Sequence, residues 1–147
     1  MATRYGQDFV QWTEEQAALI TRQDWTAIDW ENIQEEIQAL GRSEQHELEN
    51  RLEVLLEHLL KRCYVDSAYD NRGWELTIKE QRKQLRRLLR ASPSLKAYWA
   101  EIFDEIWADA LSDVQDIYPT VTLPNECPFP MTVEALLTEM FWIDLGS

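Results

Sequence analysis

The sequence predicts an all-α fold, a bundle of about six helices, from three observations. Glycine and proline, which most often interrupt helices, number only four and five in 147 residues, and most of the prolines stand near the end. Leucines recur at helical spacing along one long stretch. The strict alternation of apolar and polar residues that is typical of strands is nowhere sustained. A chain of this length can bury one core, so we expect a single helical domain over residues 1–147.

The first two predicted helices cover residues 7–21 and 30–40. A short connection rich in helix-capping residues separates them. Gly41 is expected to end the second helix as its C′ residue, because glycine enters the left-handed backbone region without penalty. The expected apolar faces consist of Phe9, Trp12, Leu19 and Ile20 in the first helix, and of Trp30, Ile33, Ile37 and Leu40 in the second.

The third helix, over residues 43–64, is the predicted centre of the bundle, with Ser43 as its N-cap. Its apolar residues follow the i, i+4, i+7, i+8 spacing of one helical face, and five glutamates lie off that face. So long an apolar face must be covered by other helices. It is formed by Leu48, Leu52, Leu55, Leu56, Leu59, Leu60 and Cys63.

Two more long helices are expected over residues 74–91 and 94–117. A polar loop over residues 64–73, which ends in Asp-Asn-Arg-Gly, precedes them. Ser92 and Pro93 separate the two helices, because a proline is tolerated in the first turn of a helix. The predicted apolar positions are Trp74, Ile78, Leu85, Leu88 and Leu89, then Leu95, Tyr98, Ile102, Phe103, Ile106, Trp107, Ala110, Leu111 and Val114.

The last part of the chain is a proline-rich loop over residues 118–130, followed by a short helix over residues 132–141. Four prolines in the loop forbid regular structure. The loop is expected to be either a packed strap or a mobile arm. Thr132 is the predicted cap of the helix, and Leu136, Leu137 and Met140 are expected to face inward.

The two helices beside Pro93 carry opposite charges. Six cations of helix 74–91 recur at i, i+3, i+4, i+7, i+8 and i+11, which places them in one stripe, and helix 94–117 has no cation after Lys96. We therefore expect an antiparallel helix pair of opposite charge. The basic stripe consists of Lys79, Arg82, Lys83, Arg86, Arg87 and Arg90, and the acidic stripe of Glu101, Asp104, Glu105, Asp109, Asp113 and Asp116.

Three interpretations of the basic stripe are open. The two stripes could neutralise each other, with exposed ion pairs that contribute about 0–1 kcal/mol each, or the basic stripe could be a plain solvated face. The basic stripe could bind the acidic face of a protein partner, or the phosphates of a nucleic acid. A net charge of −13 argues against bulk attraction to nucleic acid or anionic lipid. The first interpretation carries the most weight, and as the functional hypothesis we take binding of a protein partner or of a second copy of the chain.

His58 and Glu36 are the best candidates for a chemical site. If helices 30–40 and 43–64 packed antiparallel, the imidazole could be oriented by the carboxylate, which is a beginning of acid–base or metal chemistry. The alternative is a polar bridge between the two helices. His46 lies three turns earlier, and neither an HExxH motif nor a Glu-x-x-His pair is present. We therefore assign no catalytic residue, no metal and no cofactor.

The tryptophans divide into two predicted groups. Trp30, Trp74 and Trp107 are expected to anchor the core, whereas Trp25, Trp99 and Trp142 are candidates for an exposed interface, where tryptophan is enriched.

The hydropathy, the N-terminal residues and the cysteines bear on where in the cell the protein is expected. No apolar run approaches the roughly 20 residues that span a bilayer, and the N-terminal residues do not form a signal peptide. Cys63 and Cys127 stand far apart in sequence without a CxxC motif, and we expect both to be reduced in a cytoplasmic protein.

Several blocks of the sequence resemble the bacterial family known as domain of unknown function 29. They are DWENIQEEIQALGRS at 29–43, HLLK at 58–61, WELTIKEQR at 74–82, PSL at 93–95 and ECPF at 126–129. The resemblance implies an all-helical fold and, because the family is abundant in cyanobacteria, a cyanobacterial source. It implies no activity. The predicted function is therefore a non-catalytic protein-interaction module, with an enzyme around His58 and Glu36, or a nucleic-acid-linked regulator, as alternatives.

Overall fold

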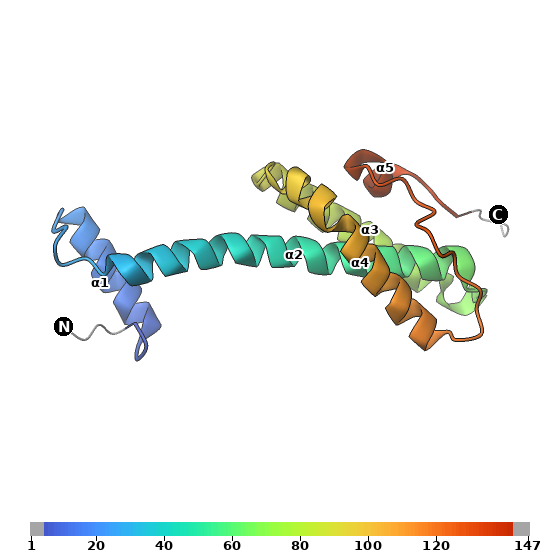
Figure 1. The fold of residues 1–147 in the computed structure, drawn as a ribbon, viewed down its shortest axis with the longest axis horizontal. Coiled ribbons are helices and arrows are strands. Elements are labelled where there is room, and N and C mark those ends of the chain that lie inside the picture. The colour runs from blue at the N-terminus through green and yellow to red at the C-terminus, as the bar shows by residue number, and fades with distance from the viewer. Residues whose placement is uncertain (1–4, 143–147) are drawn as a thin grey trace. The chain divides into compact units, whose positions relative to one another are not determined.

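The computed structural model describes residues 5–142, which form five helices and no strand. The predicted all-α fold with a long central helix is confirmed, with five helices in place of about six. None of the helices within residues 5–142 combines the length and the apolarity that a membrane crossing demands. In chain order the helices are α1 (Phe9–Thr21), α2 (Trp30–Tyr64), α3 (Ala68–Ala91), α4 (Leu95–Ile117) and α5 (Val133–Thr138) (Figure 1).

The chain divides into two compact units, Met1–Ser43 and Glu44–Ser147. The prediction of one domain over residues 1–147 stays a prediction.

The first unit is held together by polar contacts around one buried tryptophan. Trp12 of α1 is buried, and its indole N–H donates to Oδ2 of Asp29 over 3.1 Å. The side-chain oxygen of buried Gln16 accepts a hydrogen bond from the Asp29 amide over 2.8 Å. Because buried polar groups need partners, these two bonds fix the segment before α2 against α1. Ile28 completes a small core.

One continuous helix, α2, replaces the two helices predicted over residues 30–40 and 43–64. Gly41 and Ser43 lie inside it, so their predicted roles as C′ residue and N-cap are wrong. No glycine among the described residues has a positive φ. A glycine inside a helix costs only about 1 kcal/mol relative to alanine. That cost does not end a helix whose neighbouring residues favour helical structure.

The second unit contains the main core, and the predicted leucine face of α2 lies at its centre. All six leucines of that face are fully buried, and Cys63 is partly buried against them. α3 and α4 bury the apolar positions predicted for them except Tyr98 and Leu111, which are partly buried against the core. The core consists of Leu48, Leu52, Leu55, Leu56, Leu59, Leu60, Ile78, Leu85, Leu88, Leu89, Leu95, Trp99, Ile102, Phe103, Ile106, Trp107, Ala110, Val114, Phe129, Leu136 and Leu137.

The helix α3 begins six residues earlier than predicted, at Ala68. The Asp-Asn-Arg-Gly segment is therefore helical and does not form a turn. Asp70 lies in the first turn of α3, where an acidic side chain interacts favourably with the helix dipole. Its Oδ2 accepts a hydrogen bond from the Ser67 hydroxyl over 2.7 Å. The boundary between α3 and α4 at Ser92 and Pro93 agrees with the prediction.

Residues 118–132, which we call the strap, pack onto the core. Phe129 is buried, and its ring meets that of Trp107 edge to face at 6.4 Å between centroids. The indole N–H of Trp99 donates to the Met131 oxygen over 3.2 Å. The Gln115 amide donates to the oxygens of Tyr118 and Val121, both over 3.1 Å. Of the two expectations for this loop, the structure has the packed strap.

The last helix, α5, is shorter than predicted and ends at Thr138. Leu136 and Leu137 are buried as expected, whereas Met140 is exposed and its predicted inward position is wrong. Thr132 precedes the helix, but its side chain forms no capping hydrogen bond.

Candidate functional site

The basic stripe of α3 is divided between a structural contact and an exposed surface. Arg82 donates from Nε to the Leu136 oxygen over 3.0 Å and from a terminal nitrogen to the Glu139 oxygen over 2.6 Å. Arg86 donates to the Leu137 oxygen over 3.2 Å. These oxygens lie at the C-terminal end of α5, where main-chain carbonyls lack helical partners. The other four members, Lys79, Lys83, Arg87 and Arg90, are exposed.

The predicted neutralisation between the two charged stripes is not found. Among residues 5–142, no ion pair joins a cation of the basic stripe to a carboxylate of α4; the ion pairs there are Arg42–Glu35, His46–Glu49, Arg51–Glu47 and Arg62–Glu75. The last pair joins α2 to α3 over 3.1 Å, and its Arg62 side chain is almost buried. The two helices are also joined by a hydrogen bond from Nη1 of Arg51 to Oε1 of Gln81 over 3.2 Å, so neither polar link between them uses a cation of the basic stripe.

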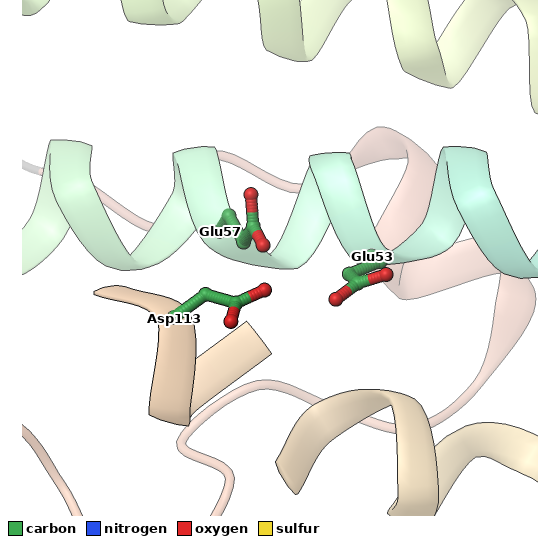
Figure 2. Close-up of side chains that lie close together, drawn as sticks. All are labelled: Glu53, Glu57 and Asp113. Carbon is green, nitrogen blue, oxygen red and sulfur yellow. The ribbon is translucent and has the colours of Figure 1, made fainter. Parts of the chain in front are cut away.

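One member of the acidic stripe instead meets two glutamates of α2. Figure 2 shows the side chains of Glu53 and Glu57 from α2 beside that of Asp113 from α4. Each residue offers one carboxylate oxygen, and these three atoms all lie within 4.8 Å of one another. We call these three residues the carboxylate cluster. Glu53 and Glu57 are half-buried and Asp113 is exposed.

The surroundings of the carboxylate cluster favour the protonated form of its two glutamates. Burial, a hydrogen bond with Asp113 and the negative charges of Asp113 and Glu53 raise the pKa of Glu57 to about 7, against a smaller opposing effect of Lys61. Burial is likewise the largest cause of a raised pKa at Glu53, followed by its hydrogen bond with Asp113. The carboxylate cluster can therefore hold a proton between two carboxylates near neutral pH. Its carboxylate oxygens are also the kind of ligand that Ca²⁺ and Mg²⁺ prefer.

Sequence reasoning missed the carboxylate cluster, although its parts were visible. Glu53 and Glu57 are an i, i+4 pair on the polar side of the leucine helix, and Asp113 belongs to the acidic stripe. The missing information was which helix the acidic stripe faces.

His58 and Glu36 do not form the predicted pair. Both lie on the single helix α2, so the antiparallel packing on which the pair depended is absent. Nδ1 of His58 donates to the Val54 oxygen over 2.8 Å. Burial, the largest cause, lowers the pKa of His58 and so favours its neutral imidazole. The Glu36 carboxylate accepts a hydrogen bond from the Tyr5 hydroxyl.

The first unit buries Trp12 as predicted but exposes other apolar side chains expected inside it, among them Phe9 and Ile20 of α1. Trp30, Ile37 and Leu40 are 53%, 64% and 69% exposed, so their predicted burial is wrong, and Ile33 is half-buried. With Ile33 they form the apolar stripe of α2. Trp25 extends it, because the Trp30 indole N–H donates to the Trp25 oxygen over 2.9 Å and the two rings lie 6.5 Å apart.

The tryptophan predictions are confirmed in part. Trp74 and Trp107 are buried and Trp25 is exposed, as expected. Trp99 is buried, contrary to its predicted exposure, because the strap supplies an acceptor for its indole N–H. Trp142 is half-buried, with the Arg62 guanidinium 5.5 Å from its ring centroid.

The comparisons with known proteins give one result. Neither the curated proteins nor the solved structures contain a match to this chain. A family model matches residues 4–142, nearly the whole sequence, and confirms the resemblance noted in the sequence blocks. The chain therefore belongs to the family described as domain of unknown function DUF29.

Proposed function

We propose that this chain is a cytoplasmic, non-catalytic protein-interaction module whose first unit supplies the contact surface. The apolar stripe of α2 is the observation that carries this proposal. Within residues 5–142, seven of the thirteen exposed large hydrophobic side chains precede residue 44. The described part of the first unit is less than a third of these residues, so apolar exposure is concentrated there. Concentrated apolar exposure on a small unit is typical of a surface that a partner covers.

The spacing of the stripe supports a helical contact. Trp30, Ile33, Ile37 and Leu40 follow intervals of three, four and three residues. These intervals are those of the a and d positions at a helix–helix seam. Burying a side chain of this size contributes about 1.5–3 kcal/mol. A partner helix laid along the stripe would therefore gain from each of these residues.

The exposed cations of α3 are a second candidate contact. Next to them lies a pocket of about 260 Å³ whose lining combines three apolar with three cationic side chains, Leu89, Val133 and Leu137 with Arg86, Arg90 and Lys96. An acidic protein segment with one apolar side chain fits this combination. The stripe of α2 remains the better supported surface, because apolar contacts supply most binding energy and exposed ion pairs little.

The proposal is tested by comparing two double variants of the full chain. Ile37→Glu with Leu40→Glu places charges on the stripe, whereas Ile117→Glu with Leu76→Glu changes the same residue types at exposed positions of the second unit. Partners are captured from a lysate of the native source by cross-linking, and self-association is measured by sedimentation velocity. We expect at least one partner, or a dimer, that survives in the control and is lost with the stripe variant. An unchanged partner set and oligomeric state in the stripe variant would contradict the proposal.

A charge-reversal variant tests the second contact without disturbing α5. Lys83→Glu with Arg87→Glu and Arg90→Glu leaves Arg82 and Arg86 in place. Loss of a partner that the stripe variant retains would assign that partner to α3. Retention of every partner would remove α3 from the proposal.

A further inference from the structure

The pocket beside the exposed cations of α3 combines positive charge with apolar surface. Its volume is about 260 Å³, just below the usual range for ligand pockets, so it suits a small ligand. Two of its apolar side chains are buried and one is half-buried, whereas all its cations are exposed. We call it the cationic pocket. It is lined by Arg86, Leu89 and Arg90 of α3, Lys96 in the first turn of α4, and Val133 and Leu137 of α5.

The three cations of this pocket have no carboxylate to pair with. No residue of its lining is acidic, and within residues 5–142 no ion pair involves Arg86, Arg90 or Lys96. The sequence has 27 acidic and only 14 basic residues, so three cations around one pocket without a carboxylate run against the composition of the chain. Arg86 and Arg90 are an i, i+4 pair, and like charges at this spacing destabilise a helix. An anion bound in the cationic pocket would offset this repulsion.

Hydrogen-bond donors are available in the cationic pocket as well. Arg86 uses one terminal nitrogen to donate to the Leu137 oxygen over 3.2 Å, and a guanidinium has five N–H donors. The side chains of Arg90 and Lys96 form no hydrogen bond within residues 5–142. The neighbouring pocket, of about 270 Å³, differs, because Glu75 lies in its lining and its Arg82 already donates to two main-chain oxygens.

We infer that the cationic pocket binds a small molecule in which a phosphate monoester is joined to a short apolar group. This inference goes beyond the proposed function, whose main surface is the apolar stripe of α2, and takes a small molecule in place of a protein segment as the occupant. Three positive charges match the nearly double negative charge of a phosphate monoester better than the single charge of a carboxylate. The planar guanidinium of arginine also binds phosphate oxygens in pairs.

The apolar side chains and the size of the pocket define the rest of the ligand. Leu89, Val133 and Leu137 offer apolar contacts to a few methylene groups next to the phosphate. The volume leaves no room for a large ligand. A net charge of −13 opposes the approach of an anionic lipid surface or a nucleic acid, whereas it opposes a small ion less. A free phosphorylated small molecule therefore fits better than a phospholipid surface.

Nuclear magnetic resonance titrations of the full chain test the inference with n-butyl phosphate, inorganic phosphate, butyrate and n-butanol. We expect n-butyl phosphate to shift the amide signals of residues 86–96 and 133–137, with a dissociation constant of about 1 mM or lower. Inorganic phosphate should bind about tenfold more weakly, since each fully buried methylene contributes a factor of about four. Butyrate should also bind more weakly, because it has a single charge, and n-butanol should cause no saturable shift.

Variants locate the binding. Arg90→Gln with Lys96→Gln should weaken n-butyl phosphate by about tenfold or more, because two of the three charged donors are lost. The matched control, Lys83→Gln with Arg87→Gln, removes the same charge from exposed positions of α3 outside the pocket lining. It should change the affinity by no more than about twofold at physiological salt. Val133→Thr keeps the shape of the side chain but adds a hydroxyl, so it should weaken n-butyl phosphate and leave inorganic phosphate unchanged.

Several results would overturn the inference. Equal weakening by the two double variants would show a general attraction to the positive surface of α3. Butyrate that binds as tightly as n-butyl phosphate would exclude a preference for phosphate. Saturable shifts with none of the probes would remove the site, and the proposed function would still stand, because it depends on α2.

Two further probes carry the same phosphate chemistry on a macromolecule. One is a short peptide with phosphoserine beside leucine, and the other is a phosphatidylcholine vesicle that contains phosphatidic acid. Binding of either probe that is more than about tenfold tighter than that of n-butyl phosphate, and that is lost in the Arg90→Gln and Lys96→Gln variant, would assign the pocket to a phosphorylated protein segment or to a membrane. Either result would overturn the small molecule as the occupant. Weaker binding of both would support it.

Discussion

Arg82 of α3 donates a hydrogen bond to the main-chain oxygen of Glu139, the residue that caps the C-terminus of α5, over 2.6 Å. The same guanidinium binds the Leu136 oxygen and lies 5.8 Å from the centroid of the Phe141 ring. A helix of only six residues has little stability of its own. α5 therefore depends on its buried leucines and on α3 for its position. A residue predicted as a partner contact thus has a structural role as well.

Replacing Arg82 by alanine should loosen α5. Hydrogen bonds that involve a charged group contribute about 1.5–3 kcal/mol, and half-exposure reduces this, so we expect a loss of about 1–2 kcal/mol in the free energy of unfolding. Urea denaturation measures the loss, and hydrogen exchange should accelerate in residues 133–141. Arg87→Ala, at an exposed position of the same helix, is the control. Equal effects of the two substitutions would contradict the assigned role of Arg82.

Gly41 should be replaceable by alanine with a gain in stability. It lies inside α2 without a positive φ, and a Cβ atom added to it would meet no other atom within 4 Å. The gain from helix propensity is about 0.5–1 kcal/mol. Gly73 in α3 has the same surroundings, so Gly73→Ala is a matched comparison. Thermal and urea unfolding followed by circular dichroism should show a higher midpoint for both. A lower midpoint for Gly41→Ala alone would show that the helix needs flexibility at this position.

The sequence was sufficient to predict what depends on local patterns. The leucine face of α2 and the boundary at Pro93 follow from spacing and from the backbone of proline, and the structure confirms them. Gly41 was interpreted wrongly because glycine permits a helix end without requiring one. The burial of Ile37 and Leu40 was predicted from helical spacing, but spacing only shows that a face is apolar. It does not show that another part of this chain packs against that face and buries it.

The carboxylate cluster could not be predicted by matching charges. Complementarity would place the acidic stripe of α4 beside the basic stripe of α3. The rotation of α4 is instead set by the burial of apolar residues such as Ala110 and Val114, both fully buried. Burial of apolar area contributes about 25 cal/mol per Å², which exceeds the small contribution of exposed charge pairs. Asp113, the neighbour of Val114, is thereby placed against Glu53 and Glu57.

Cys63 should react slowly in the folded protein. Burial raises the pKa of its thiol to about 11, and its Sγ lies 3.6 Å from the Phe141 oxygen. Since the thiolate is the reactive form, the folded protein should be alkylated by iodoacetamide at pH 8 roughly a hundredfold more slowly than an unperturbed cysteine. Mass spectrometry of the peptide that contains Cys63 measures the rate. The same reaction in urea is the control, and equal rates in both states would contradict the buried environment.

Glu57→Gln should stabilise the protein at pH 8 and lose this advantage at pH 5. The pKa of Glu57 rises from an ordinary value near 4.5 to about 7 in the folded state, chiefly through burial. Between these values the folded state binds more protons than the unfolded state, so the contribution of Glu57 to stability falls as the pH rises. Below about pH 4.5 the group is protonated in both states and has no such effect. Glutamine is uncharged at every pH, so the Glu57→Gln variant does not lose unfolding free energy through this group as the pH rises.

Urea denaturation of wild type and Glu57→Gln at pH 5, 6, 7 and 8 measures the effect. The difference in unfolding free energy should grow with pH and level off above about pH 7, where the carboxyl is ionised in both states. Glu44→Gln, on the same helix but outside the carboxylate cluster, is the control for the change of net charge. A difference that is constant over the series would mean that Glu57 is ionised throughout. In that case Asp113 would be held near Glu57 by the packing of α4 alone, without a shared proton.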